Sequence, residues 1–421
     1  MLSQTDATQR AIEAVWRTES ARIVARVTRL IGDLSIAEDL AQDALLAALE
    51  QWPQSGVPDN PGAWLTTIAK RRAVDLLRRR TLSQQKHEQV AREIEVERPD
   101  AVAQFDDALE DPIGDDLLRL IFMCCHPVLA TEARVALTLR LLGGLSTEEI
   151  ARAFLVPVPT VAQRIVRAKR TLSAAHVPFE LPPPNELSSR LDSVLEVIYL
   201  IFNEGYSATE GEHWTRPALC GEAVRLARIL AELEPDEPEV WGLLALTQIH
   251  ASRLKARVDA TGHPILLLDQ DRARWDRQLI DQGLSALARA QSNGRGGAYT
   301  LQAAIAACHA RAPTADETDW PQIASWYDLL YHVKPTPVVA LNRAVAIGMA
   351  HGPAAGLDAI DQILAEPVLA NYHILPSVRA DLLLKLGRPE EARAELERAV
   401  ALASNGAERD LLLRRLAQIA G

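Results

Sequence analysis

The chain has 421 residues, of which 48% are hydrophobic and 24% charged, and its formal net charge is −11 at pH 7. This length predicts two or three domains, and the composition excludes a disordered or collagen-like chain. The negative charge excludes a protein that coats nucleic acid non-specifically, so any DNA contact must come from local basic patches.

The sequence gives no sign of export or of a metal site. It contains no apolar run of membrane-spanning length, and its first ten residues lack the basic and then apolar layout of a signal peptide. The four cysteines form neither a C-x-x-C pair nor a zinc-ligand spacing. We therefore expect a cytoplasmic protein with no membrane partner, no metal and no cofactor.

Helical signals dominate the whole chain. Alternating β-branched runs and N-G or D-G turns are nearly absent, while Ala, Leu, Arg and Glu are abundant. The predicted fold is all-α. Composition divides it into a first helical domain, an acidic linker, a second helical domain, a proline-rich linker and a longer helical extension, at residues 1–80, 81–116, 117–175, 176–186 and 187–421.

The first distinctive helix follows Ser35. Ser35 and Glu38 have the S-x-x-E form of a capping box, which predicts a helix from Ile36 to Trp52, ended by Pro53. A Ser35→Ala change would then cost about 1 kcal/mol. The apolar side of this helix is predicted to be Ile36, Leu40, Ala44, Leu45 and Ala48. Its other side carries a polar trio, Asp39, Gln42 and Asp43, which is either a solvated face or a protein-binding one.

The next helix is strongly basic. It is predicted to start at Pro61 and to bury Trp64, Leu65, Ile68, Val74 and Leu77. It also carries six cations, with Asp75 as the only acid in the same stretch. The cations are Lys70, Arg71, Arg72, Arg78, Arg79 and Arg80. An aromatic side chain near one end and cations toward the other suit phosphate neutralisation together with stacking on an unpaired base.

Residues 88–116 hold eleven acidic side chains against Arg92 and Arg98, the composition of a linker. The apolar run Leu117–His126 that follows contains Cys124 and Cys125, for which core packing is favoured over a metal or redox role. In the extension, Ala380–Gly387 matches Val345–Gly352 at an offset of 35 residues. This is close to the period of tetratricopeptide helix pairs, of which we expect three or four degenerate copies.

A helix-turn-helix is predicted over residues 145–170. Ser146 and Glu149 form a capping box for its first helix, and Pro159 or Thr160 opens the second. The second helix would bury Val161, Ile165, Ala168 and Leu172 and turn Gln163, Arg164, Arg167 and Arg170 outward. Arg164 and Arg167 suit guanine edges, and Lys169 and Arg170 suit phosphates. The alternative is an ordinary hairpin with a basic solvated face.

Two further clusters are weaker. Asn203–Tyr206 with Glu210, Glu212, His213 and Trp214 gathers acids and an imidazole, but it lacks a second histidine at ligand spacing. Asp269–Trp275 is predicted to be a helix start with acids in its first turn rather than a switch surface. No phosphate-binding loop or nucleophile-elbow motif is present, so we expect no enzymatic activity.

Three motifs in this order resemble the extracytoplasmic-function (group IV) sigma factors of the sigma-70 family. They are Ala37–Asp43, Trp64–Arg79 and the helix-turn-helix. The resemblance covers residues 10–175, and residues 178–421 resemble, on weaker motifs, the tetratricopeptide-like extension of one subgroup. It implies a region 2 domain, a region 4 domain and a regulatory extension.

The resemblance also implies roles for individual residues. Asp39, Gln42 and Asp43 would bind the β′ clamp helices of RNA polymerase, and the region 4 domain would meet the β flap. The −10 element would be read by Asn60, Trp64, Lys70, Arg71, Arg72, Arg78 and Arg79, with the loop 54–60 shaping a pocket for one flipped base. The −35 element would be read by Thr160, Gln163, Arg164, Arg167, Lys169 and Arg170. Many relatives have Arg-Asn where this chain has Lys70-Arg71, so its −10 preference is expected to differ.

By the same resemblance, the acidic linker would run toward the polymerase cleft, either as a mimic of nucleic acid or as a plain tether. The extension would contact the two sigma domains and regulate promoter engagement in cis. One rival is a polymerase-independent helix-turn-helix regulator whose repeats sense a ligand or peptide. Another is an enzyme or scaffold centred on residues 187–421, with the N-terminal domains as targeting modules.

Overall fold

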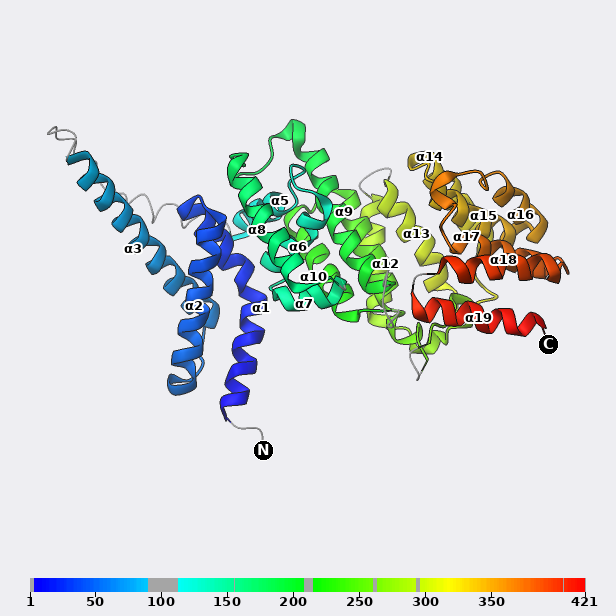
Figure 1. Ribbon diagram of the computed structural model, residues 1–421, viewed down its shortest axis with the longest axis horizontal. Helices are drawn as coiled ribbons and strands as arrows, with labels where there is room; N and C mark the ends of the chain where they lie inside the picture. The colour runs from blue at the N-terminus through cyan, green and yellow to red at the C-terminus, as the bar shows by residue number, and fades with distance from the viewer. Residues whose placement is uncertain are drawn as a thin grey trace. The chain divides into compact units, whose positions relative to one another are not determined.

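The computed structural model describes residues 4–89, 113–154, 156–207, 215–259, 263–292, 296–403 and 405–420. Every regular element in these ranges is helical (Figure 1), apart from an isolated bridge between Val258 and Pro264. The all-α prediction is therefore confirmed. Across the same ranges, no helix combines the length and the apolar character needed to cross a membrane.

The chain divides into two compact units, one of residues 1–152 and 156–197 and one of residues 198–421 with 153–155. The helices of the first unit are α1 (Gln4–Ile31), α2 (Leu34–Ser55), α3 (Pro61–Gln89), α5 (Ile113–Cys124), α6 (Thr131–Leu141), α7 (Thr147–Phe154), α8 (Val158–Ala174) and the first part of α9 (Pro184–Tyr206). Helix α1 packs against α2, α3 and α5, and α6 packs against α8.

The second unit continues from the end of α9 through helices that each pack against the next. They are α10 (Pro217–Leu233), α11 (Pro238–Ala251), α12 (Arg277–Ser292), α13 (Ala298–Arg311), α14 (Trp320–Val333), α15 (Pro337–His351), α16 (Pro353–Asp361), α17 (Ile374–Lys385), α18 (Pro389–Leu402) and α19 (Gly406–Ala420).

The capping-box prediction for α2 is wrong, because the helix starts at Leu34, two residues before the predicted Ile36. The N-cap is Asp33, whose Oδ1 accepts hydrogen bonds from the amides of Ser35 (2.8 Å) and Ile36 (3.0 Å). The helix also continues through Pro53 to Ser55. The buried stripe is consequently Leu34, Ala37, Ala41, Ala44, Ala48 and Trp52, whereas the predicted Ile36, Leu40 and Leu45 are half-buried.

Substitutions of Asp33 and Ser35 test which of the two residues is the N-cap of α2. Asp33→Ala should lower the free energy of unfolding by about 1 kcal/mol, because two amides of the first turn lose their acceptor. Ser35→Ala should change it by less than about 0.5 kcal/mol, because the Ser35 side chain is not the cap. Urea unfolding of the two variants checks this, and equal losses would contradict the assignment of Asp33.

The ends of the predicted acidic linker are helical. Helix α3 runs to Gln89 instead of ending at residue 80, and Asp115 and Asp116 belong to α5. Asp116 is buried, 2.7 Å from Arg119 and 3.5 Å from Arg29 of α1. The rest of the linker, residues 90–112, lies outside the described residues, so both interpretations of its charge stay predictions.

The helices that follow the linker form a tight core. Cys124 and Cys125 are packed in it, as predicted. Both thiols are buried and free, and burial raises the pKa of Cys125 to about 11. The first part of α9 is bonded to this core. Arg190 donates to the carbonyl of Phe122 (3.0 Å), and Ser193 donates to that of Cys125 (2.6 Å). The region from residue 187 thus begins on the helices α5 and α6.

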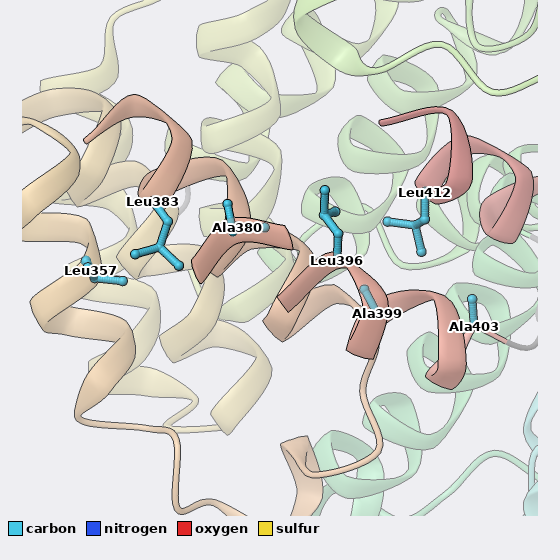
Figure 2. Packing of buried hydrophobic residues seen from close by; sticks show 8 residues of the cluster. Leu357, Ala380, Leu383, Leu396, Ala399, Ala403 and Leu412 are labelled. Carbon is cyan, nitrogen blue, oxygen red and sulfur yellow. The ribbon is translucent and has the colours of Figure 1, made fainter. Parts of the chain in front are cut away.

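The two stretches matched at an offset of 35 residues occupy equivalent places. They end α15 and α17, and each closes on a glycine with positive φ, Gly352 at 101° and Gly387 at 69°. Each glycine is followed by a helix that starts with proline, α16 or α18. Leucines and alanines of α16, α17, α18 and α19 form one core (Figure 2), including Leu357, Leu383, Leu396 and Leu412. Helix pairing is therefore present, and the tetratricopeptide assignment stays a prediction.

Residues 269–275 do not start a helix as predicted. They lie in two 3₁₀ turns, Leu267–Asp269 and Arg272–Arg274, and the next helix begins at Arg277. Arg272 and Trp275 are buried here. The prediction failed because the acids in this stretch are exposed while a cation is packed inside, a pattern set by contacts with α13.

Candidate polymerase and DNA interface

The polar trio lies on α2, but its members differ in their contacts. Asp39 is exposed. Gln42 is half-buried and donates from Nε2 to Oε1 of Glu38 (2.9 Å). Asp43 forms an ion pair with Arg72 of α3 (3.0 Å). Asp39 is therefore the member of the trio best placed to meet another protein.

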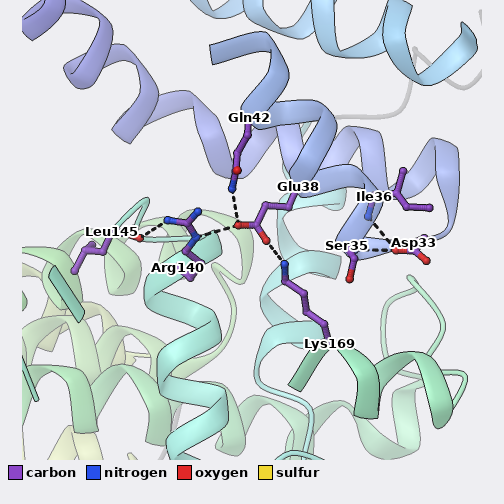
Figure 3. Close-up of polar contacts among 8 residues, drawn as sticks. All are labelled: Asp33, Ser35, Ile36, Glu38, Gln42, Arg140, Leu145 and Lys169. Carbon is purple, nitrogen blue, oxygen red and sulfur yellow. Dashed lines mark hydrogen bonds and ion pairs between the residues drawn. The ribbon is translucent and has the colours of Figure 1, made fainter. Parts of the chain in front are cut away.

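Glu38 joins the N-terminal helices to the helix-turn-helix (Figure 3). Its side chain is 8% exposed, and Oε1 accepts from Nε of Arg140 at 2.9 Å. Oε2 is bonded to Nζ of Lys169, which is 15% exposed. Arg140 also donates to the carbonyl of Leu145 (3.2 Å). We call Glu38, Arg140 and Lys169 the Glu38 cluster.

The electrostatics of the Glu38 cluster favour the charged carboxylate. Burial raises the pKa of Glu38, but Lys169 and Arg140 outweigh it and hold the pKa below the usual 4.5. Since the pKa of Glu38 is lower in the folded state than in the unfolded state, the charged carboxylate stabilises the fold at neutral pH. That stabilisation is lost as the pH falls through the folded-state pKa.

Glu38→Gln should therefore lower the free energy of unfolding at pH 7 by about 2 to 3 kcal/mol, since it leaves two cations of the cluster without their acceptor charge. The difference should shrink as the pH falls below 4.5 and should disappear below the folded-state pKa of Glu38. Denaturant unfolding at several pH values measures both effects. A difference that stays constant over the whole acidic range in which the protein remains folded would show that the charge of Glu38 does not matter.

Helix α3 presents the predicted basic face. Arg71, Arg78 and Arg79 are exposed, and Lys70 is half-buried. Four cations of this unit, Arg26, Lys70, Arg71 and Arg78, line one hollow of about 670 Å³ with Asp75 as its only acid. Arg26 comes from α1 and was not predicted. This surface has the charge to follow a phosphate backbone.

Two other predicted −10 residues have structural contacts. Asn60 caps α3, because its Oδ1 accepts from the amide of Ala63 (3.0 Å). Trp64 is half-buried and packs edge-on against the buried Trp52, with ring centroids 5.3 Å apart. Asn60 and Trp64 therefore fix the start of α3, where the loop 54–60 meets the helix.

The helix-turn-helix forms close to the predicted bounds. The amide of Ser146 donates to Oε2 of Glu149 (2.8 Å), and the amide of Glu149 donates to Oγ of Ser146 (3.1 Å), so the capping box is confirmed. Helix α8 begins at Val158, slightly before the predicted start. It buries the four expected residues, Val161, Ile165, Ala168 and Leu172.

The predicted DNA-reading side of α8 is accessible at most positions. Gln163, Arg167 and Arg170 are exposed, and Thr160 and Arg164 are half-buried. Lys169 differs, because its ammonium group is bonded to Glu38. In this arrangement the ammonium group of Lys169 is occupied by Glu38, and its contact with a phosphate stays a prediction.

The roles of Glu38 and Arg140 were not predicted from the sequence. Glu38 was interpreted as a capping residue, and Arg140 was not considered. One signal was present: Glu38 lies beside Ala37 and Ala41 on the buried side of α2, and a buried acid requires a cationic partner. The sequence alone could not name that partner, since Lys169 is 131 residues away.

Three family models match the chain. Sigma-70 region 2 matches residues 6–82, and sigma-70 region 4 matches residues 119–172. A family of unknown function, DUF6596, matches residues 190–291. The two sigma matches coincide with α1–α3 and α5–α8, which carry the basic face and the helix-turn-helix.

The chain is also similar to known proteins, some of which are named as sigma factors. An uncharacterized protein of Rhizobium meliloti is 41% identical over 400 residues, covering 93% of this chain and 92% of that protein. The probable ECF RNA polymerase sigma factor SigI of Mycobacterium tuberculosis is 23% identical over 248 residues, covering 51% and 84%. The ECF RNA polymerase sigma factor SigC of the same species is 29% identical over 180 residues, covering 43% and 91%. No solved structure matches the chain.

Sigma factors are transcription initiation factors rather than enzymes, and their domains bind core RNA polymerase and promoter DNA. The order of the two sigma domains, the helices that they contain and the relatives named as sigma factors all indicate the same family. The chain belongs to the extracytoplasmic-function sigma factors of the sigma-70 family and carries an additional C-terminal helical domain.

Proposed function

We propose that this sigma factor docks on the β′ clamp helices through Asp39, Gln42 and Asp43 and reads promoters with two separate surfaces. The region 4 domain would meet the β flap. The basic face of α3 would engage the −10 element, and Gln163, Arg164, Arg167 and Arg170 of α8 would engage the −35 element. The exposure of Gln163, Arg167 and Arg170 and the partial exposure of Arg164, on a capped helix-turn-helix, support the second role.

We further propose that the Glu38 cluster marks a closed form of the protein. The names of the two promoter elements place them about 25 base pairs apart, which is roughly 85 Å of duplex at 3.4 Å per pair. In the closed form, Lys169 of α8 is bonded to Glu38 of α2, and α3 packs directly on α2. The two DNA-reading helices are then too close to occupy both elements, so the cluster must open during promoter binding.

The observation that carries this proposal is the bond of a recognition-helix lysine to a buried acid of region 2. Glu38→Gln should open the cluster and free Lys169 for a phosphate. We expect the free protein to bind duplex −35 DNA several-fold more tightly, with a salt slope larger by about one. Glu50→Gln, an equal change of charge at an exposed position of α2, is the matched control.

Fluorescence anisotropy over a range of salt concentrations measures both quantities. Equal affinity and slope in wild type and Glu38→Gln would rule out the closed form. An equal gain in both variants would show that only net charge matters, which also contradicts the proposal.

The proposal also includes regulation in cis, in which the C-terminal extension controls the activity of the sigma domains. Its support is the attachment of Arg190 and Ser193 to backbone carbonyls of region 4. Arg134 of α6 also pairs with Glu196 (3.2 Å). A change transmitted along α9 would therefore act on the helices that hold α8. A truncated protein for testing this should end after residue 197, where the first unit ends, and not at residue 175.

A further inference from the structure

The second unit contains a buried group of cations around one indole ring. Arg253, Arg272 and Trp275 are 7%, 6% and 3% exposed. The guanidinium carbon of Arg253 lies 5.7 Å from the centre of the Trp275 ring, and that of Arg272 lies 4.9 Å from it. Two positive charges thus share one aromatic side chain inside the protein. We call these three residues the Trp275 cluster.

The hydrogen bonds of the two arginines all go to neutral groups. Arg272 donates to the carbonyls of His309 (2.7 Å) and Ala312 (2.6 Å) and to Oγ1 of Thr318 (3.1 Å). Arg253 donates to the hydroxyl of Tyr206 and lies 2.7 Å from Nδ1 of His250.

Three donors of the cluster remain unsatisfied. Nε of Arg253, Nε of Arg272 and Nε1 of Trp275 have no acceptor in the part of the chain that the structure describes. Buried N–H groups are nearly always bonded, so three of them around one ring indicate that an acceptor belongs there.

The missing acceptor should be negatively charged. Within the described ranges, neither Arg253 nor Arg272 forms an ion pair with a carboxylate, although Glu317 acts on Arg272 from further away. The nearby histidines add no negative charge. Burial, followed by the arginines, lowers the pKa of His309 to about 3 and that of His250 well below its usual value, so both are neutral. Isolated buried cations are costly without an anion.

We propose that the Trp275 cluster binds a phosphate group, either inorganic phosphate or the phosphate of a small phosphorylated molecule. A phosphate carries a charge of about −1.5 to −2 and several acceptor oxygens, which match two guanidinium groups and an additional N–H donor. A water molecule would satisfy donors but not the charge. The cluster lies within the segment matched by the family of unknown function, and the proposal does not depend on the sigma-factor function.

The test uses the full chain and inorganic phosphate. Thermal unfolding is followed while phosphate replaces sodium chloride at constant ionic strength, and acetate serves as a carboxylate comparison. A ligand that binds only the folded protein raises the Tm with its concentration. We expect phosphate to raise the Tm and acetate to leave it unchanged, and titration calorimetry should give a saturable heat for phosphate alone.

Arg253→Gln and Arg272→Gln should abolish the phosphate response. The control is Arg289→Gln, because Arg289 also stacks on a tryptophan, at 4.1 Å from the Trp241 ring, but is exposed. This variant should keep the full response. Circular dichroism checks that each variant is folded. If Arg253→Gln unfolds, Arg253→Lys replaces it in the test. Because this variant keeps the charge, it should show a reduced but measurable phosphate response.

The wild type alone can refute the proposal. No Tm shift and no heat with phosphate, or the same shift with acetate, would overturn it. Glu210 and Glu212, which lie outside the described residues, are the competing source of negative charge. If they neutralise the arginines, replacing both glutamates by glutamine should lower the Tm in the absence of ligand, and phosphate should leave the Tm of the wild type unchanged.

Discussion

Asp39→Ala should weaken binding of core RNA polymerase by about 30-fold or more, the effect of removing a central charged contact worth about 2 kcal/mol. Asp39 is exposed on α2, and no hydrogen bond or ion pair of its side chain occurs within the described residues. The substitution should therefore leave the free energy of unfolding unchanged. Adding Gln42→Ala should complete the loss, but it also removes a hydrogen bond to Glu38.

The matched control is Glu50→Ala, which removes an exposed acid from the same helix, about three turns away. Binding to immobilised core enzyme, measured for wild type and both variants, checks the expectation. Unchanged binding by the double variant Asp39→Ala/Gln42→Ala would place the polymerase contact elsewhere.

Arg164→Ala and Arg167→Ala should each cost about 1 to 3 kcal/mol at the preferred −35 element and much less at altered ones. Each arginine can donate two hydrogen bonds to a guanine edge, so its loss removes discrimination between bases. Arg167 is exposed on α8, and Arg164 is half-buried on the same helix. Selectivity should therefore relax in both variants.

Arg170→Ala is the comparison, since a phosphate contact carries no base information. It should weaken binding to all −35 sequences by a similar factor and lower the salt slope by about one. Competition binding over single-base variants of the element gives these values. Uniform losses for Arg164→Ala and Arg167→Ala would contradict their assignment as base readers.

The local signals in the sequence were informative where a few neighbouring residues decide the structure. Ser146 and Glu149 predicted a cap that forms, and the spacing of Val161, Ile165, Ala168 and Leu172 predicted the buried side of α8. Both depend on contacts within one or two turns of a helix. The paired helices of the extension follow from the same kind of signal, a glycine and then a proline.

The sequence failed where a distant residue competes for the same side chain. Glu38 had the spacing of a capping residue, yet Asp33 caps the helix and Glu38 binds Arg140 and Lys169. The bond between Lys169 and Glu38 could not be predicted for the same reason. Arg253 and Arg272 were likewise not recognised as neighbours, since the turns around Trp275 bring them together rather than any periodicity.

Promoter-directed transcription is the most direct test of the central claim. Core RNA polymerase is mixed with the full chain and a template that contains the region upstream of its own gene, and multi-round transcripts are measured. We expect a transcript from one defined start that requires the chain and disappears with Asp39→Ala/Gln42→Ala. Absence of both core binding and transcript with the wild-type chain would contradict its role as a sigma factor.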